Sequence, residues 1–185
     1  MKYETFNPEI HDLAKVSKLF YDVDFRTFDM LFKSPEAAIK SISKILKDED
    51  TETFTVILDD DENVIGILIY FMDSFPIHFT FKSLRLLIVD ILDYFVLCDV
   101  GPGDLYIADL AIDDSLRGQG IGRKVLGDVI EYARQENLNR VILDADFRNE
   151  GAKKLYEKVG FKEFNKKRLK FLNFERGMHN MEFIL

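Results

Sequence analysis

The sequence predicts an α/β domain in which a mixed central sheet of about six to seven strands is flanked by helices. Residues 105–145 read as strand, helix and strand, a unit that places two parallel strands side by side through a right-handed crossover. Residues 53–71 read as an antiparallel hairpin, which makes the sheet mixed. With 47% hydrophobic and 31% charged residues, the 185-residue chain has the composition of one globular domain spanning residues 1–185.

Two helices and the hairpin are expected before residue 73. Apolar residues at helical spacing predict a first helix over residues 8–21. A second is predicted over 34–46, with Ser34 as the N-cap and Pro35 as the first helical residue. Residues 53–58 and 64–71 are the hairpin strands, and the acidic run 59–63 is their turn.

Residues 73–103 are predicted to form an extra helical insertion. Its apolar positions, which include Leu84, Leu87 and Ile88, cover more of the helix surface than one buried side requires. Charged residues interrupt the run, and a membrane span needs roughly 20 mostly apolar residues, so we expect no membrane segment. The excess apolar surface around 84–97 is a candidate lid, pocket wall or homodimer contact.

The remainder of the chain is predicted to alternate between strands and helices. In order, the expected elements are a strand at 105–112, a glycine-rich turn at 117–122, an amphipathic helix at 123–136 with Asn137 as a left-handed C-cap, a strand at 140–145, a helix at 150–159 ended by Gly160, and closing strands at 161–164, 170–174 and 181–185.

Composition excludes several functions. A formal charge of −8 argues against general nucleic-acid binding, which uses Lys and Arg to neutralise phosphates. Three scattered histidines and the single Cys98 offer no metal-ligand spacing and no internal disulfide. We therefore expect no bound metal. The first residues also lack the apolar stretch of a secretory signal, so we expect a cytoplasmic protein.

The turn at 117–122, Arg-Gly-Gln-Gly-Ile-Gly, has the features of an anion site. Unpaired N–H groups and the positive end of the helix dipole meet at the start of the following helix, and glycines let a phosphate approach the backbone. A glycine-rich turn is also compatible with a plain tight connection. A Rossmann dinucleotide site does not fit, because glycines at 118, 120 and 122 lack the Gly-x-Gly-x-x-Gly spacing.

Two motifs resemble those of the GNAT superfamily of N-acetyltransferases. The family's pyrophosphate motif, Arg/Gln-x-x-Gly-x-Gly/Ala, is met by Arg117, Gly120 and Gly122. Its second signature matches Asn149, Ala152, Leu155, Tyr156, Lys158, Gly160 and Phe161. The resemblance covers residues 104–164, and the insertion at 73–103 matches no family feature.

The resemblance implies a site for acetyl-CoA between the strands at 105–112 and 140–145, which would splay apart. The pantetheine arm would pair with the strand edge at Leu110, Ala111 and Ile112, where one N–H group would also polarise the acetyl carbonyl. Residues expected to contact the rest of the cofactor are Arg117, Gly118, Gln119, Gly120, Ile121, Gly122, Arg123, Asn149, Ala152 and Lys158. Asn149 is equally explained as a helix N-cap.

Acetyl transfer to an amine needs a base and, for the leaving thiolate, an acid. Tyr156 is the candidate acid, with a core tyrosine as the alternative. Asp109 is the candidate base, because it lies eight residues before Arg117, where the resemblance implies a Glu or Asp, and because a carboxylate among apolar strand residues is expected to have a raised pKa. Water, Asp144 or Asp146 are alternatives for the base, and Asp109 is also explained as a hydrogen-bonded residue at the splayed strand edge.

The predicted function is therefore N-acetyl transfer from acetyl-CoA to a primary amine of a small molecule or peptide. A CoA-binding regulator without catalysis is the alternative, and an interaction protein built on the apolar helix is a third. Retention of both Asp109 and Tyr156 favours the enzyme, because a module that only binds CoA needs neither side chain.

Overall fold

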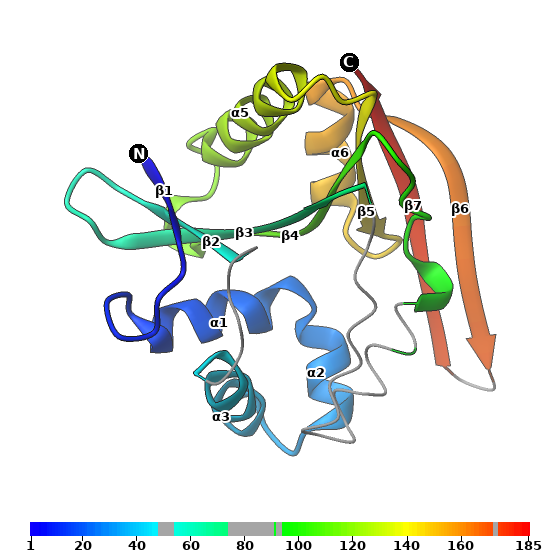
Figure 1. Cartoon of the computed structure of the whole chain (residues 1–185). Coiled ribbons are helices and arrows are strands. Elements are labelled where there is room, and N and C mark those ends of the chain that lie inside the picture. Colours follow the sequence, from blue (N-terminus) through cyan, green and yellow to red (C-terminus); the bar gives the residue numbers. More distant parts are fainter. Residues whose placement is uncertain (48–53, 74–90, 92–93, 172–173) are drawn as a thin grey trace. The chain divides into compact units, whose positions relative to one another are not determined.

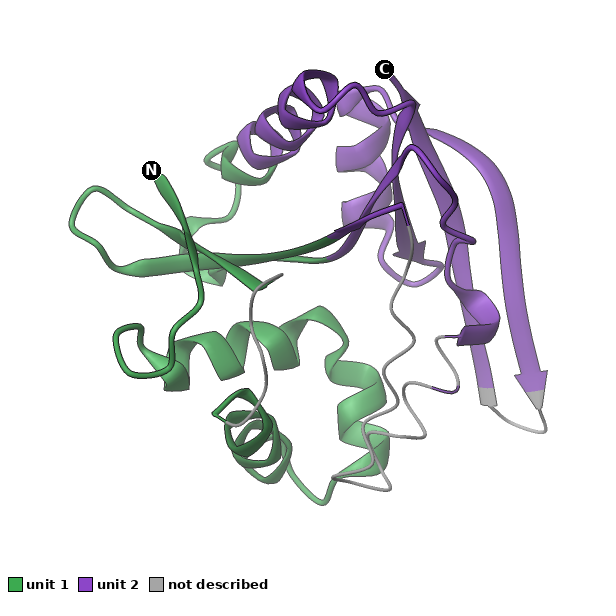
Figure 2. Cartoon of the chain, viewed as in Figure 1, with its two compact units in different colours: residues 1–70, 109–122 green, residues 71–108, 123–185 purple. Residues whose placement is uncertain are grey.

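The computed structural model describes residues 1–47, 54–73, 91, 94–171 and 174–185. The chain divides into two compact units, Met1–Tyr70 with Asp109–Gly122, and Phe71–Ala108 with Arg123–Leu185 (Figure 2). The strand order is β1-β2-β3-β4-β5-β7-β6 (Figure 1). Strand β4, Asp104–Ile112, supplies residues to both units. The predicted mixed α/β sheet of six to seven strands is thus confirmed.

The first unit contains the predicted hairpin. Strands β2, Phe54–Leu58, and β3, Val64–Met72, pair antiparallel. The outer neighbour of β2 is β1, Lys2–Thr5, which the sequence analysis did not predict. β2 and β3 supply a dense core, in which Val56, Ile57 and Ile67 are fully buried.

Three helices accompany these strands, and Figure 1 shows them on one side of β1–β3. They are α1, Leu13–Val23, α2, Phe25–Leu31, and α3, Pro35–Leu46. The predicted cap of α3 is confirmed, because the Ser34 hydroxyl accepts the Ala37 N–H at 3.3 Å. The predicted start of the first helix at residue 8 was too early. The Asp12 carboxylate accepts the Lys15 N–H at 3.0 Å and makes Leu13 the first helical residue.

The second unit contains the parallel pair of strands. Strand β5, Arg140–Asp146, pairs with β4 in parallel register, as predicted. Helix α5, Ile121–Gln135, connects the two strands and buries its apolar face, including Val125, Leu126 and Val129. Asn137 ends this helix with φ 57°, the left-handed conformation expected of a C-cap.

The end of the chain differs from the prediction. Helix α6, Glu150–Val159, ends as expected at Gly160, whose φ is 117°. Three short closing strands were predicted, whereas the structure has two long ones, β6, Lys162–Phe171, and β7, Phe174–Ile184. These two strands pair antiparallel. Strand β7 lies between β5 and β6, so it belongs to the interior of the sheet.

The predicted insertion is described in part. Ile91 and residues 94–96 are helical, and Val96 is fully buried whereas Tyr94 and Phe95 are exposed. Leu84, Leu87 and Ile88 lie outside the described residues, as does most of the predicted dimer contact at 84–97. Within the described ranges, no helix has the length and apolar character needed to span a membrane.

Candidate active site

Strands β4 and β5 share a short ladder. Their register runs from Asp104 opposite Arg140 to Ile107 opposite Leu143. Both strands continue beyond this last pair, β4 to Ile112 and β5 to Asp146. The end of the ladder therefore lies just before Asp109 and the predicted pantetheine edge.

The second half of β4 faces β3 with alternate residues. The Ala111 carbonyl oxygen lies 2.7 Å from where a Cβ on Gly66 of β3 would stand, so a side chain at Gly66 would clash with it. Two residues further along the chain, the Asp113 N–H donates to the Ile65 carbonyl at 2.9 Å. Because backbone groups alternate along a strand, those of Leu110 and Ile112 point to the side opposite β3. Of the three predicted edge residues, Leu110 and Ile112 are thus the two whose backbone groups point away from β3.

The glycine turn adopts the conformation that only glycine takes without strain. Gly118 and Gly120 have φ values of 79° and 80°, and a Cβ on either would meet no atom within 4 Å. Glycine is thus required at positions 118 and 120 by the backbone conformation and not by crowding from neighbouring atoms. The turn residues 117–120 are exposed, and α5 begins directly after them at Ile121. The first N–H groups of α5 lack partners within the helix and are available to an anion.

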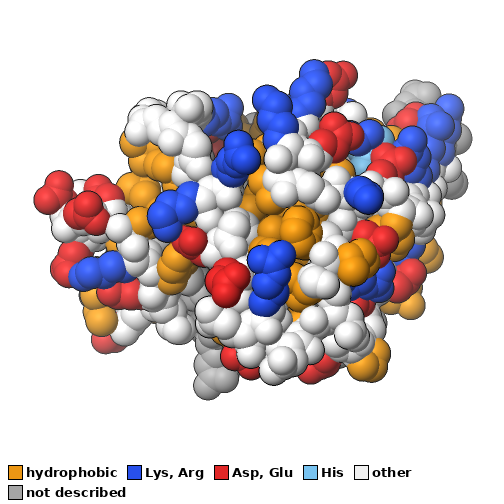
Figure 3. All heavy atoms as spheres, turned by 90° about the horizontal axis from the view of Figure 1, so that it is seen from above, with side chains coloured by type: hydrophobic (Ala, Val, Ile, Leu, Met, Phe, Trp, Pro, Cys, Tyr) orange, Lys and Arg blue, Asp and Glu red, His pale blue; other side chains and the backbone are white. Residues whose placement is uncertain are grey.

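The charged residues of the turn are at the surface. Arg117 follows the 3-10 turn Asp114–Leu116 and forms an ion pair with Asp114. Arg123 is exposed in the first turn of α5. Gln119 is exposed, while Ile121 and Gly122 are partly buried. Figure 3 views the molecule from the side of α5 and α6, where Lys and Arg side chains lie among Asp and Glu.

Asp109 is the carboxyl group best suited to act as a base. It lies on β4, is mostly buried, and in the described part of the chain has no hydrogen bond or ion pair. Burial, followed by the negative charge of Asp24, raises the pKa of Asp109 to about 6. A carboxylate that titrates near neutrality accepts a proton more readily than one with an ordinary pKa of 3.8.

Asp144 and Asp146 are less suited to this role. The Asp144 carboxylate accepts hydrogen bonds from the Cys98 N–H at 2.9 Å, the Tyr106 hydroxyl at 3.0 Å and the Asn180 amide at 2.5 Å. Burial raises its pKa despite these donors, but the donors occupy its oxygens. Burial would raise the pKa of Asp146 too, yet hydrogen bonds from Arg148 outweigh it and hold that pKa below its usual value.

Helix α6 carries the second predicted group of site residues, in the other unit. Tyr156 is the buried residue of this helix, with 9% of its surface exposed, and its ring centroid lies 6.0 Å from that of Phe161. Asn149 caps the helix, since its side chain accepts the Ala152 N–H at 3.1 Å. Ala152 is partly buried and Lys158 is exposed.

Two residues that act on the predicted site, Asp113 and Asp24, were not predicted. Asp113 forms an ion pair with Lys15, and its side chain accepts the Ser115 N–H at 2.8 Å, which fixes the start of the segment leading into the turn. The Asp-x-Ser spacing is a known turn signal and would have indicated it. Asp24, which acts on Asp109, has no comparable signal. Among the described residues, no three His, Cys, Asp or Glu side chains gather as a metal site would require.

Comparison with known proteins identifies the family. The profile of the acetyltransferase (GNAT) family matches residues 19–161. A glucosamine 6-phosphate N-acetyltransferase of Trypanosoma brucei brucei is 37% identical over 57 residues, which are 31% of this chain and 37% of that protein. N-alpha-acetyltransferase 30 of Saccharomyces cerevisiae is 34% identical over 56 residues, 30% of this chain and 32% of that protein. The chain matches about a third of the length of these relatives.

Solved structures share the fold over the whole chain. An N-acetyltransferase from Staphylococcus aureus Mu50 superposes with a TM-score of 0.66 at 21% identity, covering 99% of this chain and 100% of that one. The NatC complex bound to Gag peptide and CoA gives a TM-score of 0.57 at 19% identity, covering 100% of this chain and 98% of that one. At these identities the structural likeness shows the fold alone. The family profile matches more than half of the sequence and therefore shows the family. The chain belongs to the acetyltransferase (GNAT) family.

Proposed function

We propose that this protein is an N-acetyltransferase that moves the acetyl group of acetyl-CoA to a primary amine. The observation that carries the proposal is the turn at 117–122, where Gly118 and Gly120 have positive φ and α5 begins directly afterwards. Such a turn suits a diphosphate, because exposed N–H groups and the helix dipole favour negative charge at the same place. The family membership makes CoA the expected diphosphate.

The thioester would extend from this turn along β4. Leu110 and Ile112 offer backbone groups on the side away from β3, and pantetheine carries amides that pair with a strand edge. One of these N–H groups would also donate to the acetyl carbonyl oxygen. That contact strengthens as the oxygen becomes an anion, which is how such donors lower the barrier.

The chemistry would then be direct transfer. The amine nitrogen attacks the carbonyl carbon, and Asp109 takes the proton that the amine loses, directly or through a water molecule. The tetrahedral intermediate collapses, the carbon–sulfur bond breaks, and Tyr156 donates its hydroxyl proton to the departing thiolate. The products are an acetylated amine and CoA with a free thiol.

The comparisons suggest two classes of acceptor. One relative is named for an amino sugar phosphate and another for N-alpha acetylation, and a structural neighbour holds a peptide and CoA. Both classes present a primary amine. We propose a small-molecule or peptide amine as the acceptor of this chain.

Two measurements test the function. Titration calorimetry with acetyl-CoA and with CoA should show binding below millimolar concentration, and absence of binding would remove the proposal entirely. A free-thiol assay across amino sugars, peptide N-termini and polyamines should then show CoA release that depends on the amine. Binding without release for any amine would favour a CoA-binding regulator instead.

A further inference from the structure

Gly66 is a glycine in the interior of a central strand, where glycine weakens a sheet. It lies on β3, which runs between β2 and β4, and it is buried between Ile65 and Ile67. Glycine has no side chain to pack there and loses more conformational freedom on folding than any other residue. Its φ is not positive, unlike those of Gly118 and Gly120, so the backbone conformation does not require glycine. The reason for this glycine therefore lies in the atoms around it.

The space beside Gly66 is filled mainly by β4. A Cβ on Gly66 would stand 2.7 Å from the Ala111 carbonyl oxygen and 2.7 Å from Cδ1 of Ile112. It would also stand 3.1 Å from Cδ1 of Ile57 on β2. The two Cδ1 atoms are the ends of flexible side chains and can rotate away, whereas the carbonyl oxygen can move only with its backbone. A side chain at position 66 would therefore displace β3 or β4.

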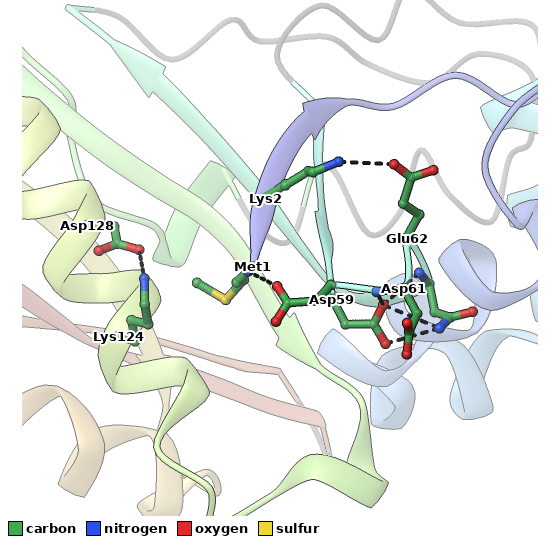
Figure 4. A network of polar contacts seen from close by, with 9 residues as sticks. Met1, Lys2, Asp59, Asp61, Glu62, Lys124 and Asp128 are labelled. Atoms are coloured by element: carbon green, nitrogen blue, oxygen red, sulfur yellow. Dashed lines mark hydrogen bonds and ion pairs between the residues drawn. The ribbon is translucent and has the colours of Figure 1, made fainter.

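Of these two strands, β3 is held in place on its other side. It pairs with β2 along the whole length of that strand. The turn between them is closed by Asp59, whose carboxylate accepts the N–H groups of Asp61 and Asn63 at 2.9 and 2.8 Å (Figure 4). The ion pair of Lys2 with Glu62, at 3.0 Å, joins the same turn to β1. We therefore expect β4 to be the strand that moves.

The oxygen that would be displaced belongs to the same peptide unit as the Ile112 N–H. Because a peptide unit is planar and trans, the Ala111 C=O and the Ile112 N–H point in opposite directions and move together. The oxygen lies against β3, so the N–H points away from β3, and Ile112 is partly exposed. The next N–H along the chain, that of Asp113, donates to Ile65 at 2.9 Å and fixes the end of this stretch. Gly66 thus sets how far the Ile112 N–H stands from β3.

We propose that Gly66 is a positioning residue for acetyl-CoA. Because position 66 has no side chain, the peptide unit of Ala111 and Ile112 lies close against β3, where its N–H donates to a carbonyl oxygen of the cofactor. That oxygen belongs to a pantetheine amide or to the thioester, and both are carbonyl acceptors that a strand edge can bind. This role rests on the proposed function, because it needs acetyl-CoA to lie along β4.

The test is titration calorimetry of Gly66→Ala with acetyl-CoA, CoA and adenosine 3′-phosphate 5′-diphosphate, which is the part of CoA without pantetheine. Acetyl-CoA should bind roughly three- to tenfold more weakly than to the wild type, as loss of one hydrogen bond implies. The nucleotide should keep its affinity, because its diphosphate binds at the turn 117–122. Equal weakening of CoA and acetyl-CoA would assign the N–H to a pantetheine amide. A loss confined to acetyl-CoA binding and to kcat would assign it to the thioester.

Two further variants separate positioning from packing. Gly127→Ala adds the same methyl group on α5, where it meets no atom within 4 Å, and should leave all three affinities unchanged. It should also stabilise α5, so it supplies a second background in which to fold Gly66→Ala. The double variant Gly66→Ala with Ile112→Val loses Cδ1 of Ile112 but keeps the clash with the carbonyl oxygen. It should bind acetyl-CoA as weakly as Gly66→Ala alone.

Four results would overturn the proposal. They are wild-type affinity for acetyl-CoA in Gly66→Ala, equal weakening of acetyl-CoA and the nucleotide, full recovery of acetyl-CoA affinity in the double variant, and a Gly66→Ala chain that does not fold even in the Gly127→Ala background. Recovery would place the clash at a side chain, and failure to fold would assign Gly66 to the fold. Failure of the proposed function would look different, because the wild type would then bind neither acetyl-CoA nor the nucleotide.

Discussion

Asp109 combines a raised pKa with the absence of any partner in the described part of the chain, and this makes its role open to a direct test. As the proposed base, it is active when ionised, so the transfer rate should rise with pH through about 6. Asp109→Asn should lower kcat by about 10²- to 10⁴-fold and remove this limb of the rate–pH profile. An unshifted profile would take Asp109 out of the mechanism.

The same residue should reduce stability at neutral pH. Its pKa of 3.8 in the unfolded chain rises to about 6 on folding, so the folded state disfavours the ionised form. The penalty is absent below pH 3.8 and grows as pH rises through about 6, reaching at most about 3 kcal/mol at ~1.4 kcal/mol per unit. Asp109→Asn should therefore unfold at a higher temperature than the wild type at pH 7.5 and at a similar temperature near pH 4. Equal melting temperatures at both values would contradict the raised pKa.

Asp24 is expected to influence the pKa of Asp109 and with it the pH dependence of the transfer rate. Its negative charge helps to raise the pKa of Asp109, so Asp24→Asn should move the acidic limb of the rate–pH profile to lower pH, by a fraction of a unit. Asp22→Asn is the control, because Asp22 lies two residues away and is paired with Lys18. A limb that moves equally in both variants would indicate a general charge effect.

Tyr156 is the proposed acid, and its burial on α6 also fits a core tyrosine. Tyr156→Phe removes the hydroxyl and retains the ring that packs near Phe161. If Tyr156 protonates the thiolate, kcat should fall by about 10²-fold or more with the dissociation constant of CoA unchanged. A variant with normal turnover would assign the hydroxyl a structural role.

At the scale of elements, the glycine turn and α5 offer a matched pair of substitutions. Gly120→Ala places a Cβ on a residue with φ 80°, which should destabilise the fold by about 1–2 kcal/mol and weaken acetyl-CoA binding. Gly127→Ala, at an exposed site inside α5 where a Cβ meets nothing, should stabilise by about 0.5–1 kcal/mol and leave binding unchanged. Denaturant unfolding and calorimetry measure both. Acetyl-CoA binding that survives Gly120→Ala unaltered would separate the turn from the cofactor.

The elements that the sequence predicted are those with a local signal. Helix α3 has a serine cap and a proline, and α5 has a clear apolar stripe, so both were placed within two residues. Strand β1 has four exposed residues and no apolar pattern, and α2 has seven residues and no side-chain cap, so neither was recognised.

The closing strands show a different limit. Strand β6 is exposed and rich in lysine, whereas β7 is interior but carries Arg176 and Asn180, both buried. Neither strand shows the alternation of apolar and polar residues from which a strand is predicted. Their length is determined by their pairing with each other, which the sequence does not show. The site residues are similar. Motif spacing selected Gly120 and Tyr156, but the environments of Asp109 and Asp144 depend on side chains from distant segments, and Asp24 could not be inferred.

At the scale of the whole molecule, β4 joins the two units, since Asp104–Ala108 belong to one and Asp109–Ile112 to the other. Because one strand supplies ladder partners to both, we expect a single cooperative unfolding transition, as one domain would show. The Asp104 carboxylate allows a test from within one unit. It is 4% exposed and accepts two hydrogen bonds from Arg140, at 2.7 and 2.9 Å.

Asp104→Asn should destabilise the protein by roughly 2–3 kcal/mol, because it removes a buried carboxylate that pairs with the Arg140 guanidinium and leaves Glu182 as the remaining ion-pair partner. In differential scanning calorimetry, the whole heat-absorption peak should shift to lower temperature while calorimetric and van't Hoff enthalpies stay equal. Saturating acetyl-CoA should raise the midpoint of the same peak, since a ligand bound to the folded state stabilises all that unfolds with it. Two peaks, of which Asp104→Asn moves one, would mean that β4 does not couple the units and that residues 1–185 unfold as two bodies.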